Sequence, residues 1–457
     1  MRSPLRLLPL LALAACGEAA VQDGAAPEAA VLAPASLTAP APPRPNLLSG
    51  LQTERMEAVG DGLVLYGVTL PGEAGALTAA ELRLEGLRAV SGGIAADRVT
   101  GRDLSAERAD GARVRLASVT VTNLVIGDGC TEGTRLACAS WDLLAATDAE
   151  AVSAASRWRA DLLTVAEFDR GRAALVRAAG VAGDRPAPGV MPTMPRLIAR
   201  GLGAPLGLAG LAEADALRAD AVRLTDADLS DAVRGGGALA FGALRVTRPT
   251  LSRGGQPLSR AASLSLRDVE VAGARLIRAA GSVVGARADL GASLGEGAAR
   301  AAQAAGLSAT RGGAEFTYVR EVGGAKLDAD WRLAGQGRGR LSLRFADDAA
   351  TSLAGGRIEV EDQGALDGFF AVAAAAEGQD PLLLRRQVLG ALTFVAMQVA
   401  RDDPEAARAA DAVLAFAARG GALEVTLRPD EPVASPALAA APPAEALRRL
   451  GLGATLR

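Results

Sequence analysis

Two cysteines, Cys130 and Cys138, are the side chains whose type and spacing most directly point to chemistry. They stand close together in a glycine- and threonine-containing stretch, residues 128–138. In an exported protein an even pair of neighbouring cysteines predicts a disulfide. A metal site is the alternative, but this stretch offers no other soft ligand. We therefore predict a small disulfide-closed loop, which contributes about 2.6 kcal/mol by the chain-entropy estimate.

The rest of the sequence argues against an active site. It contains no histidine, which excludes Ser-His-Asp and Cys-His catalysis and histidine metal sites. Neither a phosphate-binding loop ending in Gly-Lys-Ser/Thr nor a Ser-x-x-Lys motif is present. The densest carboxylate set is Asp226, Asp228 and Asp231. A calcium loop of the EF-hand type that begins at Asp226 would need glycine at its sixth position and glutamate at its twelfth. This sequence has Asp231 and Gly237 at these two positions. The sequence therefore predicts no catalytic residue, no metal site, no cofactor and no enzyme.

A short apolar stretch after the basic start ends in Leu13-Ala14-Ala15-Cys16. This run resembles the lipobox of bacterial lipoproteins, in which the signal peptide is cleaved before the cysteine and the cysteine is acylated. The stretch is too short to span a bilayer, which takes roughly 20 residues; the alternative is an ordinary secretory signal. The resemblance implies that residues 1–15 are removed and that Cys16 anchors the protein in the cell envelope, facing the periplasm. No aspartate follows Cys16, which favours the outer membrane over the inner one.

Residues 16–46 are rich in alanine and proline, which predicts an extended spacer between the membrane and the folded body. The formal net charge of the whole chain is −3, so no overall field attracts nucleic acid. Arginine-rich strand faces could contact lipid headgroups or polysaccharide, but they alternate with acidic residues, which is typical of a solvated face. The membrane is therefore the expected partner, through the anchor, with a lipid or another envelope protein as a further one.

Apolar residues recur in a five-residue pattern, apolar-x-apolar-x-x. The clearest runs are Val114, Leu116, Val119, Val121, Leu124, Ile126 and Leu264, Leu266, Val269, Val271, Ala274, Leu276. Strict alternation would predict a flat strand with one buried face. Here the parity changes after every second apolar residue, which indicates either a β-solenoid that turns a corner every five residues or long antiparallel strands with bulges that redirect the side chains.

Glycine pairs separate these runs and predict hairpin turns at residues 91–93, 235–237, 254–255, 312–313 and 355–356. The stretch 217–231 also resembles pentapeptide-repeat proteins, although only Ala227-Asp228-Leu229 matches their unit. The spacing of the turns fits a meandering antiparallel sheet. Residues 60–126 and 212–360 thereby resemble the AsmA/TamB-like envelope proteins, which implies an extended sheet that curves into an open groove.

Two helical regions are predicted to interrupt the strands. One covers residues 151–179, with Trp158, Leu162 and Val165 on one face. The other is a helical hairpin over residues 380–420, because Asp380-Pro381 and Asp403-Pro404 each place an N-cap before proline at the first helical position. After it come a strand from Leu423, a short helix over 445–450 and a last strand at 454–456, a tail that we expect to dock on the body.

The predicted fold class is mainly β with inserted helices, an elongated antiparallel or solenoid-like sheet. The predicted organisation is a signal peptide (1–15), a spacer (16–46), an N-terminal β region with the disulfide loop (47–150), a helical insertion (151–200), a β-repeat region (201–379), the helical hairpin (380–421) and a C-terminal strand and tail (422–457). The expected function is non-enzymatic, either lipid handling or scaffolding in the envelope. A lipid-carrying groove would be lined by Leu116, Val121, Leu266 and Val271, whereas in a closed core these residues would be buried. The alternatives are a module that binds an envelope protein through the 380–420 helices and a pentapeptide-like structural solenoid.

Overall fold

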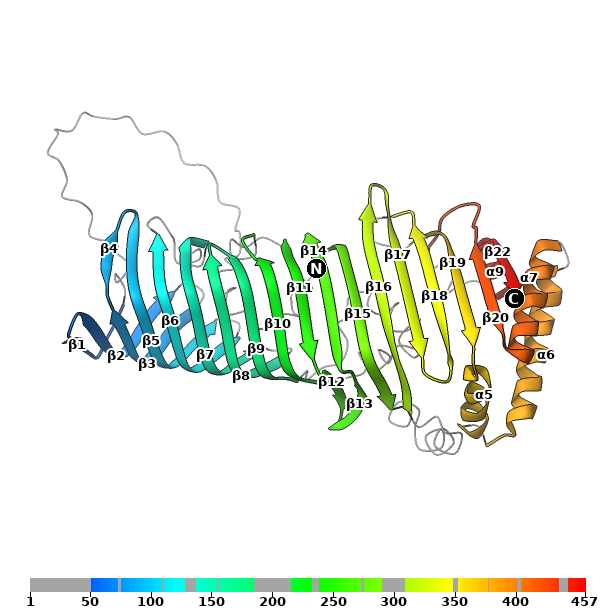
Figure 1. The fold of residues 1–457 in the computed structure, drawn as a ribbon, viewed down its shortest axis with the longest axis horizontal. Helices are drawn as coiled ribbons and strands as arrows, with labels where there is room; N and C mark the ends of the chain where they lie inside the picture. The colour runs from blue at the N-terminus through cyan, green and yellow to red at the C-terminus, as the bar shows by residue number, and fades with distance from the viewer. Residues whose placement is uncertain are drawn as a thin grey trace, which may run out of the picture. The chain divides into compact units, whose positions relative to one another are not determined.

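The computed structural model describes residues 51–72, 75–108, 111–127, 137–153, 156–184, 215–231, 238–272, 275–289, 309–347, 352–376, 378–400, 404–434 and 443–457. These residues form 22 β-strands and the helices α5, α6, α7 and α9 (Figure 1). The prediction of a mainly β protein with inserted helices is confirmed. The chain divides into two units, one of residues 5–179 and 225–239 and one of residues 1–4, 180–224 and 240–457, called below the N-terminal and C-terminal units.

The N-terminal unit is built from long antiparallel strands. Hydrogen bonding runs from β1 through β2, β3, β5, β6 and β7 to β8, and β4 forms a hairpin with β5. The strands are β1 (Arg55–Val59), β2 (Gly62–Gly72), β3 (Gly75–Glu85), β4 (Arg88–Val90), β5 (Gly93–Arg108), β6 (Arg113–Gly127), β7 (Ala139–Ser153) and β8 (Ser156–Asp169). The strands β9 (Arg172–Asp184) and β10 (Ala216–Asp228) each have residues in both units.

In the C-terminal unit, an antiparallel sheet runs from β14 through β15, β16, β17, β18 and β19 to β20 and β22 (Figure 1). The short strand β21 pairs with the first two residues of β19. Its elements are β11 (Leu239–Thr247), β12 (Thr250–Arg253), β13 (Gln256–Arg260), β14 (Ser263–Ala272), β15 (Arg275–Asp289), β16 (Ala309–Glu321), β17 (Gly324–Leu333), β18 (Gly337–Phe345), β19 (Ser352–Asp362), α5 (Ala365–Ala376), α6 (Pro381–Ala400), α7 (Pro404–Arg419), β20 (Ala422–Leu427), β21 (Val433–Ala434), α9 (Pro443–Arg449) and β22 (Leu452–Leu456).

The five-residue pattern has one backbone cause. In many repeats, the second of the two residues between apolar pairs has a positive φ, for example Asp103 (50°), Asn123 (53°), Asp148 (48°) and Asp268 (51°). A left-handed residue within a strand reverses the alternation of the side chains that follow it. The apolar pairs on both sides of it therefore point the same way.

The pairing register is the same before and after Asp103, Asn123 and Asp148, so neighbouring strands change parity at the same level. A register shift, which marks a β-bulge, occurs in β14 beside Asp268. Of the two predicted alternatives, long antiparallel strands are correct and the solenoid is wrong. Register shifts of the predicted kind occur between strands β12 to β19, whereas the pairings from β2 to β8 keep a constant register.

Polar and glycine residues occupy these positions because they tolerate the left-handed region best. Glycine takes the same place in other repeats, as at Gly67 (φ 58°), Gly180 (61°) and Gly285 (62°). The apolar positions next to them supply the core. In β7 and β8, for example, Ala146 is fully buried and Leu163 is 2% exposed.

The predicted helix over 151–179 is wrong, because these residues lie in β7, β8 and β9. Trp158, Leu162 and Val165 are spaced by four and three residues, which imitates a helical face. In β8 the true repeat is Trp158, Ala160, Leu163, Val165 and Phe168, whereas Leu162 projects outward and is 39% exposed. The apolar spacing of two and three residues thus continues through the stretch that was predicted to be a helix. The remainder of the predicted helical insertion, 185–200, lies outside the described residues.

The glycine pairs divide into two kinds. Gly92-Gly93 and Gly254-Gly255 mark turns as predicted, and 235–237 lie outside the described residues. The turns predicted at 312–313 and 355–356 are wrong, since these glycines lie inside β16 and β19. A Cβ on Gly312 would lie 2.3 Å from the carbonyl oxygen of Arg332, so the strand needs glycine there for close approach of its neighbour.

The C-terminal helices and tail follow the prediction closely. α6 begins at Pro381, and the Asp380 carboxylate accepts hydrogen bonds from the backbone N–H groups of Leu382 (2.7 Å) and Leu383 (3.1 Å). β22 pairs with β20, so the tail docks on the sheet as expected. Helix α5 was not predicted, because its alanine-rich sequence shows no strong polar face.

Candidate binding surfaces of the C-terminal unit

Charged side chains form two rows across one face of the C-terminal sheet. In the first row Glu315, Asp330, Arg340, Glu359 and Glu424 are directly opposite neighbours on the five strands β16 to β20. In the second row Gly313, Arg332, Arg338, Glu361 and Ala422 are paired in the same way. Side chains two residues apart on a strand share a face, so both rows project from the same side of the sheet.

The residues between the two rows face the other way and form the core. Leu327, Ala329, Leu341 and Tyr318 pack there as one buried cluster, with Trp331 and Ile358 partly buried against it. The alternation along β17 and β18 thus separates an apolar face from a charged one. The charged face is the one that is available for recognition.

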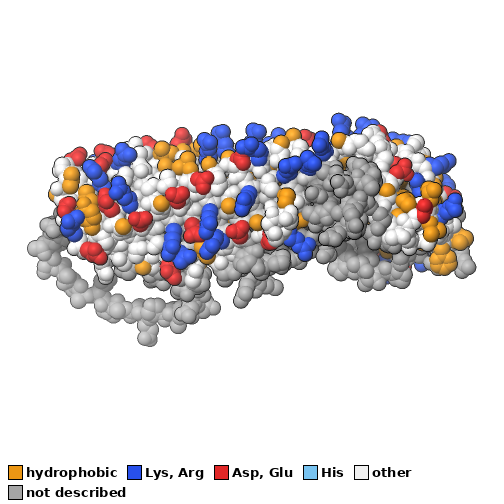
Figure 2. Space-filling model, turned by 90° about the horizontal axis from the view of Figure 1, so that it is seen from below, with side chains coloured by type: hydrophobic (Ala, Val, Ile, Leu, Met, Phe, Trp, Pro, Cys, Tyr) orange, Lys and Arg blue, Asp and Glu red, His pale blue; other side chains and the backbone are white. Residues whose placement is uncertain are grey.

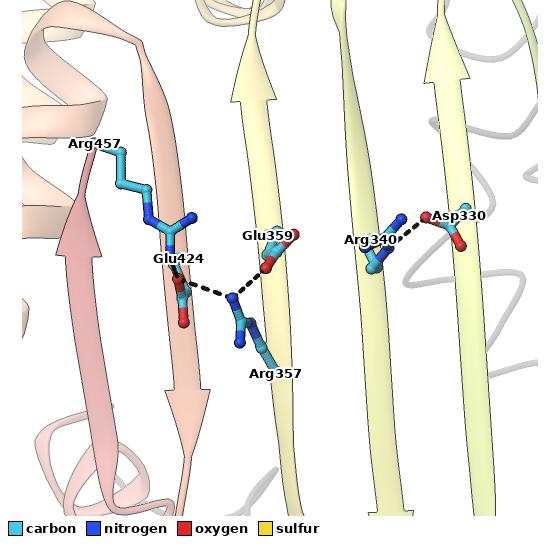
Figure 3. A network of polar contacts seen from close by, with 6 residues as sticks. All are labelled: Asp330, Arg340, Arg357, Glu359, Glu424 and Arg457. Carbon is cyan, nitrogen blue, oxygen red and sulfur yellow. Dashed lines mark hydrogen bonds and ion pairs between the residues drawn. The ribbon is translucent and has the colours of Figure 1, made fainter.

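Ion pairs link the rows from strand to strand (Figure 3). The Arg340 guanidinium donates to Asp330 at 2.7 Å, and Arg457 donates to Glu424 at 2.5 Å. Arg338 pairs with Glu361 at 2.5 Å. These groups are mostly exposed, and exposed pairs contribute little to stability, about 0–1 kcal/mol each; their main effect is to hold the charged side chains in place.

Two pKa values reflect these contacts. The hydrogen bond from Gln363 and that from Arg338 lower the pKa of Glu361, and the hydrogen bond and charge of Asp330 raise the pKa of Arg340. Both groups therefore stay charged near neutral pH. A carboxylate with a lowered pKa is a poor general acid, so Glu361 is not suited to donate a proton near neutral pH.

The two rows enclose an open groove of about 930 Å³. Its lining includes the charged residues of both rows, whose side chains project from the charged face. One edge carries four carboxylates and one guanidinium (Glu315, Asp330, Glu359, Glu424, Arg340), and the other carries four guanidiniums and one carboxylate (Arg311, Arg332, Arg338, Arg457, Glu361). The edges thus carry net charges of −3 and +3, although Figure 2 shows basic and acidic side chains intermingled over the face in view.

A second surface lies on the helices. Phe370, Ala374 and Leu384 form the buried contact between α5 and α6, with Val388 packed against them. Arg385 ties the three helices together, since it pairs with Asp367 of α5 (2.7 Å) and donates to the carbonyl oxygens of Ala417 (3.2 Å) and Ala418 (2.8 Å) at the end of α7.

The opposite face of α6 has large apolar side chains in solvent. Leu383 is 49% exposed and Phe394 and Met397 are each 59% exposed, and with Arg386 and Gly390 they form a stripe with spacings of three and four residues. Phe369 of α5 and Leu382 are also exposed. No helix among the described residues is long and apolar enough to cross a membrane. Exposed apolar patches of this kind mark interaction sites.

The structure separates the predicted groove residues. Leu116 and Val121 lie on β6 in the N-terminal unit and are 7% and 9% exposed. Leu266 and Val271 lie on β14 in the C-terminal unit and are half-buried. Burial of Leu116 and Val121 is the arrangement that we expected for a closed core.

Two of the three cysteines, Cys16 and Cys130, lie outside the described residues. Cys138 lies just before β7 and is in a disulfide. The carboxylate of Asp228 is bound to the Ser230 hydroxyl (2.5 Å) and to Arg172 (3.2 Å), and Asp231 accepts from the Ala238 N–H at 2.7 Å. Among the described residues no cluster of potential metal ligands occurs.

Sequence reasoning named the 380–420 helices as an alternative binding module, but it did not identify the exposed stripe of α6, and it missed the charged groove. The charged residues of the groove stand in i, i+2 pairs such as Asp330/Arg332 and Arg338/Arg340, which a solvated strand also shows. What makes them a groove is the register between strands, and nothing in a single sequence fixes which arginine faces which carboxylate.

The profile of a family described as "Uncharacterized protein" matches residues 268–457. The chain matches no curated protein sequence. The matched segment runs from β14 to the C-terminus, so it contains both the charged groove and the helices α5, α6, α7 and α9. The similarity to this family thus covers both candidate binding surfaces.

Proposed function

We propose that this protein is a non-enzymatic scaffold of the bacterial cell envelope, anchored through an acylated Cys16 and seated on the periplasmic surface of a membrane by its C-terminal helices. The observation that carries this proposal is the exposed apolar stripe of α6, in which Leu383, Phe394 and Met397 project into solvent. The Ala/Pro-rich spacer gives the folded body enough reach to return to the bilayer that holds the anchor.

The composition of α6 favours a lipid surface as the occupant of the stripe. Its only charged side chains are Arg385 and Arg386, and it has no acidic residue. Arg385 is engaged with α5 and α7, whereas Arg386 lies within the stripe. Aromatic and aliphatic side chains beside an arginine suit the headgroup boundary of an anionic bilayer.

Scaffolding is favoured over lipid transport by the burial of Leu116 and Val121. A carrier needs an apolar groove that opens to its lipid, and these two positions are closed. A second candidate, docking of an envelope protein on α6, uses the same exposed side chains and is decided by the same experiment.

The anchor and the helix are tested together. A fatty-acid probe should label the wild-type chain in cells and should not label Cys16→Ala. The unlabelled Cys16→Ala chain should still float with vesicles of phosphatidylglycerol and phosphatidylcholine, and the added substitutions Phe394→Asn and Met397→Asn should reduce this association at least fivefold. Val322→Asn is the matched control, because Val322 is fully exposed in a turn of the sheet, away from the helices.

Absence of labelling in the wild type would refute the anchor. Vesicle binding that survives Phe394→Asn and Met397→Asn would refute the membrane contact of α6. Loss of a specific crosslink to one envelope protein in the same variants, without any vesicle binding, would favour the partner-docking alternative instead.

A further inference from the structure

Three charged side chains of the groove differ from the others because they have no partner among the described residues. These are Arg311 and Glu315 on β16 and Arg332 on β17. All other charged residues that line the groove form ion pairs: Asp330 with Arg340, Arg338 with Glu361, Glu359 with Arg357, and Glu424 with Arg357 and Arg457. Within the described residues, therefore, the unused hydrogen-bonding capacity of the groove is concentrated in these three groups.

The three groups surround one glycine. Gly313 lies directly opposite Arg332, and Arg311 and Glu315 stand two residues before and after it on the same face of β16, each about 7 Å away along the strand. Gly313 leaves the floor between them bare. A Cβ there would lie 2.9 Å from the carbonyl oxygen of Val283, so a larger residue is disfavoured by space as well.

The arginines create an unfavourable arrangement that an anion would relieve. Arg332 is directly opposite Arg338, and like charges at directly opposite positions repel. Arg338 has Glu361 on its other side, at 2.5 Å, but Arg332 has no such counter-charge. A bound anion between Arg332 and Arg311 would remove the repulsion, and the planar fork of guanidinium suits phosphate oxygens.

From this geometry we infer that the groove binds a phosphate monoester that also carries an ammonium group, with the phosphate at Arg311 and Arg332 and the ammonium at Glu315. The charge balance selects this class. Two guanidiniums and one carboxylate give the site a net charge of +1. A phosphate monoester carries about −1.5 to −2 at neutral pH, so a ligand with one ammonium group has a net charge near −1. A phosphodiester with the same ammonium group is neutral and fits less well.

Phosphoethanolamine is the simplest probe with this chemistry. It occurs as a free molecule and, as a diester, in the headgroup of phosphatidylethanolamine, and two arms of the experiment separate these sources. Titration calorimetry of the full-length chain in detergent measures the affinity for free phosphoethanolamine, and flotation with phosphatidylethanolamine vesicles measures the lipid form. Glycerol phosphate, which lacks the ammonium group, tests the role of Glu315.

Arg332→Gln should weaken phosphoethanolamine binding about tenfold, since a charge-assisted hydrogen bond is lost. Glu315→Gln should weaken phosphoethanolamine binding by a similar factor and leave glycerol phosphate binding unchanged or tighter. Arg344→Gln is the charge-matched control. Arg344 is an exposed arginine on the same face of β18, outside the groove, and its replacement should change the affinity less than twofold.

Several results would overturn the inference. Equal weakening by Arg332→Gln and Arg344→Gln would mean that phosphate responds to general surface charge. Equal affinity for phosphoethanolamine and glycerol phosphate, unaffected by Glu315→Gln, would remove the ammonium site. No binding of either probe at millimolar concentration would reject the whole site. Thermal unfolding of every variant verifies that a loss of binding is not a loss of folding.

Discussion

Glu359 and Glu424 lie directly opposite each other on β19 and β20, and the guanidinium of Arg357 contacts both carboxylates, at 2.5 and 3.1 Å. The two acids would repel each other at this spacing, and the side chain of Glu424 is only 15% exposed. The positive charge between them is therefore part of what allows β20 to pair with β19.

Arg357→Gln is expected to destabilise the protein by about 1 kcal/mol, because it leaves Glu359 and Glu424 opposite each other without the arginine between them. Only Glu424 then keeps an ion pair, with Arg457. Chemical denaturation measures the change. The double variant Arg357→Gln/Glu359→Gln should regain most of the loss, since the repulsion disappears with one acid. A double variant that is as unstable as the single one would show that Arg357 acts through packing instead.

The strand positions with a positive φ should tolerate glycine but not a β-branched residue. Asp148 has φ 48°, so Asp148→Gly should leave stability within about 0.5 kcal/mol of the wild type or raise it, whereas Asp148→Val should cost about 2 kcal/mol because a β-branched residue is strained there. Asp161, at the same level of the neighbouring strand β8 and without a positive φ, is the control. Asp161→Val should be nearly neutral, and an equal loss at both positions would reject the backbone explanation.

Asp228 predicts a dependence on pH. The hydrogen bond from the Ser230 hydroxyl is the largest cause that lowers the pKa of this carboxyl below 3.8. Burial acts in the opposite direction, and the Ser230 N–H and the charge of Arg172 lower the pKa further. A carboxyl with a lowered pKa in the folded state stabilises the protein above the pKa of the unfolded chain and loses this effect as the pH falls through the lower, folded value. The stability difference between wild type and Asp228→Asn should therefore be full at pH 7 and shrink below about pH 4. Thermal unfolding between pH 7 and pH 2.5 tests this, and a difference that does not decrease at all over this range would contradict it.

The disulfide predicts that removing one or both of its cysteines lowers the stability by the same amount. Cys138→Ser should lower stability by about 2.6 kcal/mol, the entropy of closing a short loop. If Cys130 is the partner of Cys138, the double variant Cys130→Ser/Cys138→Ser should match the single one. Mass spectrometry of the non-reduced protein should show the two peptides linked. A free thiol at Cys130 in exported material would assign Cys138 to a different partner.

The sequence allowed those parts of the fold to be predicted that depend on local rules. Asp380-Pro381 predicted the start of α6, and the parity change between Leu266 and Val269 predicted a bulge at Asp268. The same rules failed at Trp158, Leu162 and Val165. Leu162 projects outward and is not part of the strand repeat, but when it is counted with Trp158 and Val165 the spacings of four and three residues match those of a helical face. The groove was beyond prediction for a different reason. Arg332 and Arg338 are separated in sequence by a turn, and only the strand register places them opposite each other.

The helix α7 packs against β22, the last strand of the C-terminal sheet. Among the described strands β22 pairs with β20 alone, so its other side would offer unpaired N–H and C=O groups to any extended chain nearby. The helix occupies the space that such a chain would need. This protects the sheet from edge-to-edge aggregation, so destabilising α7 should promote oligomers that grow from this border before the sheet itself unfolds.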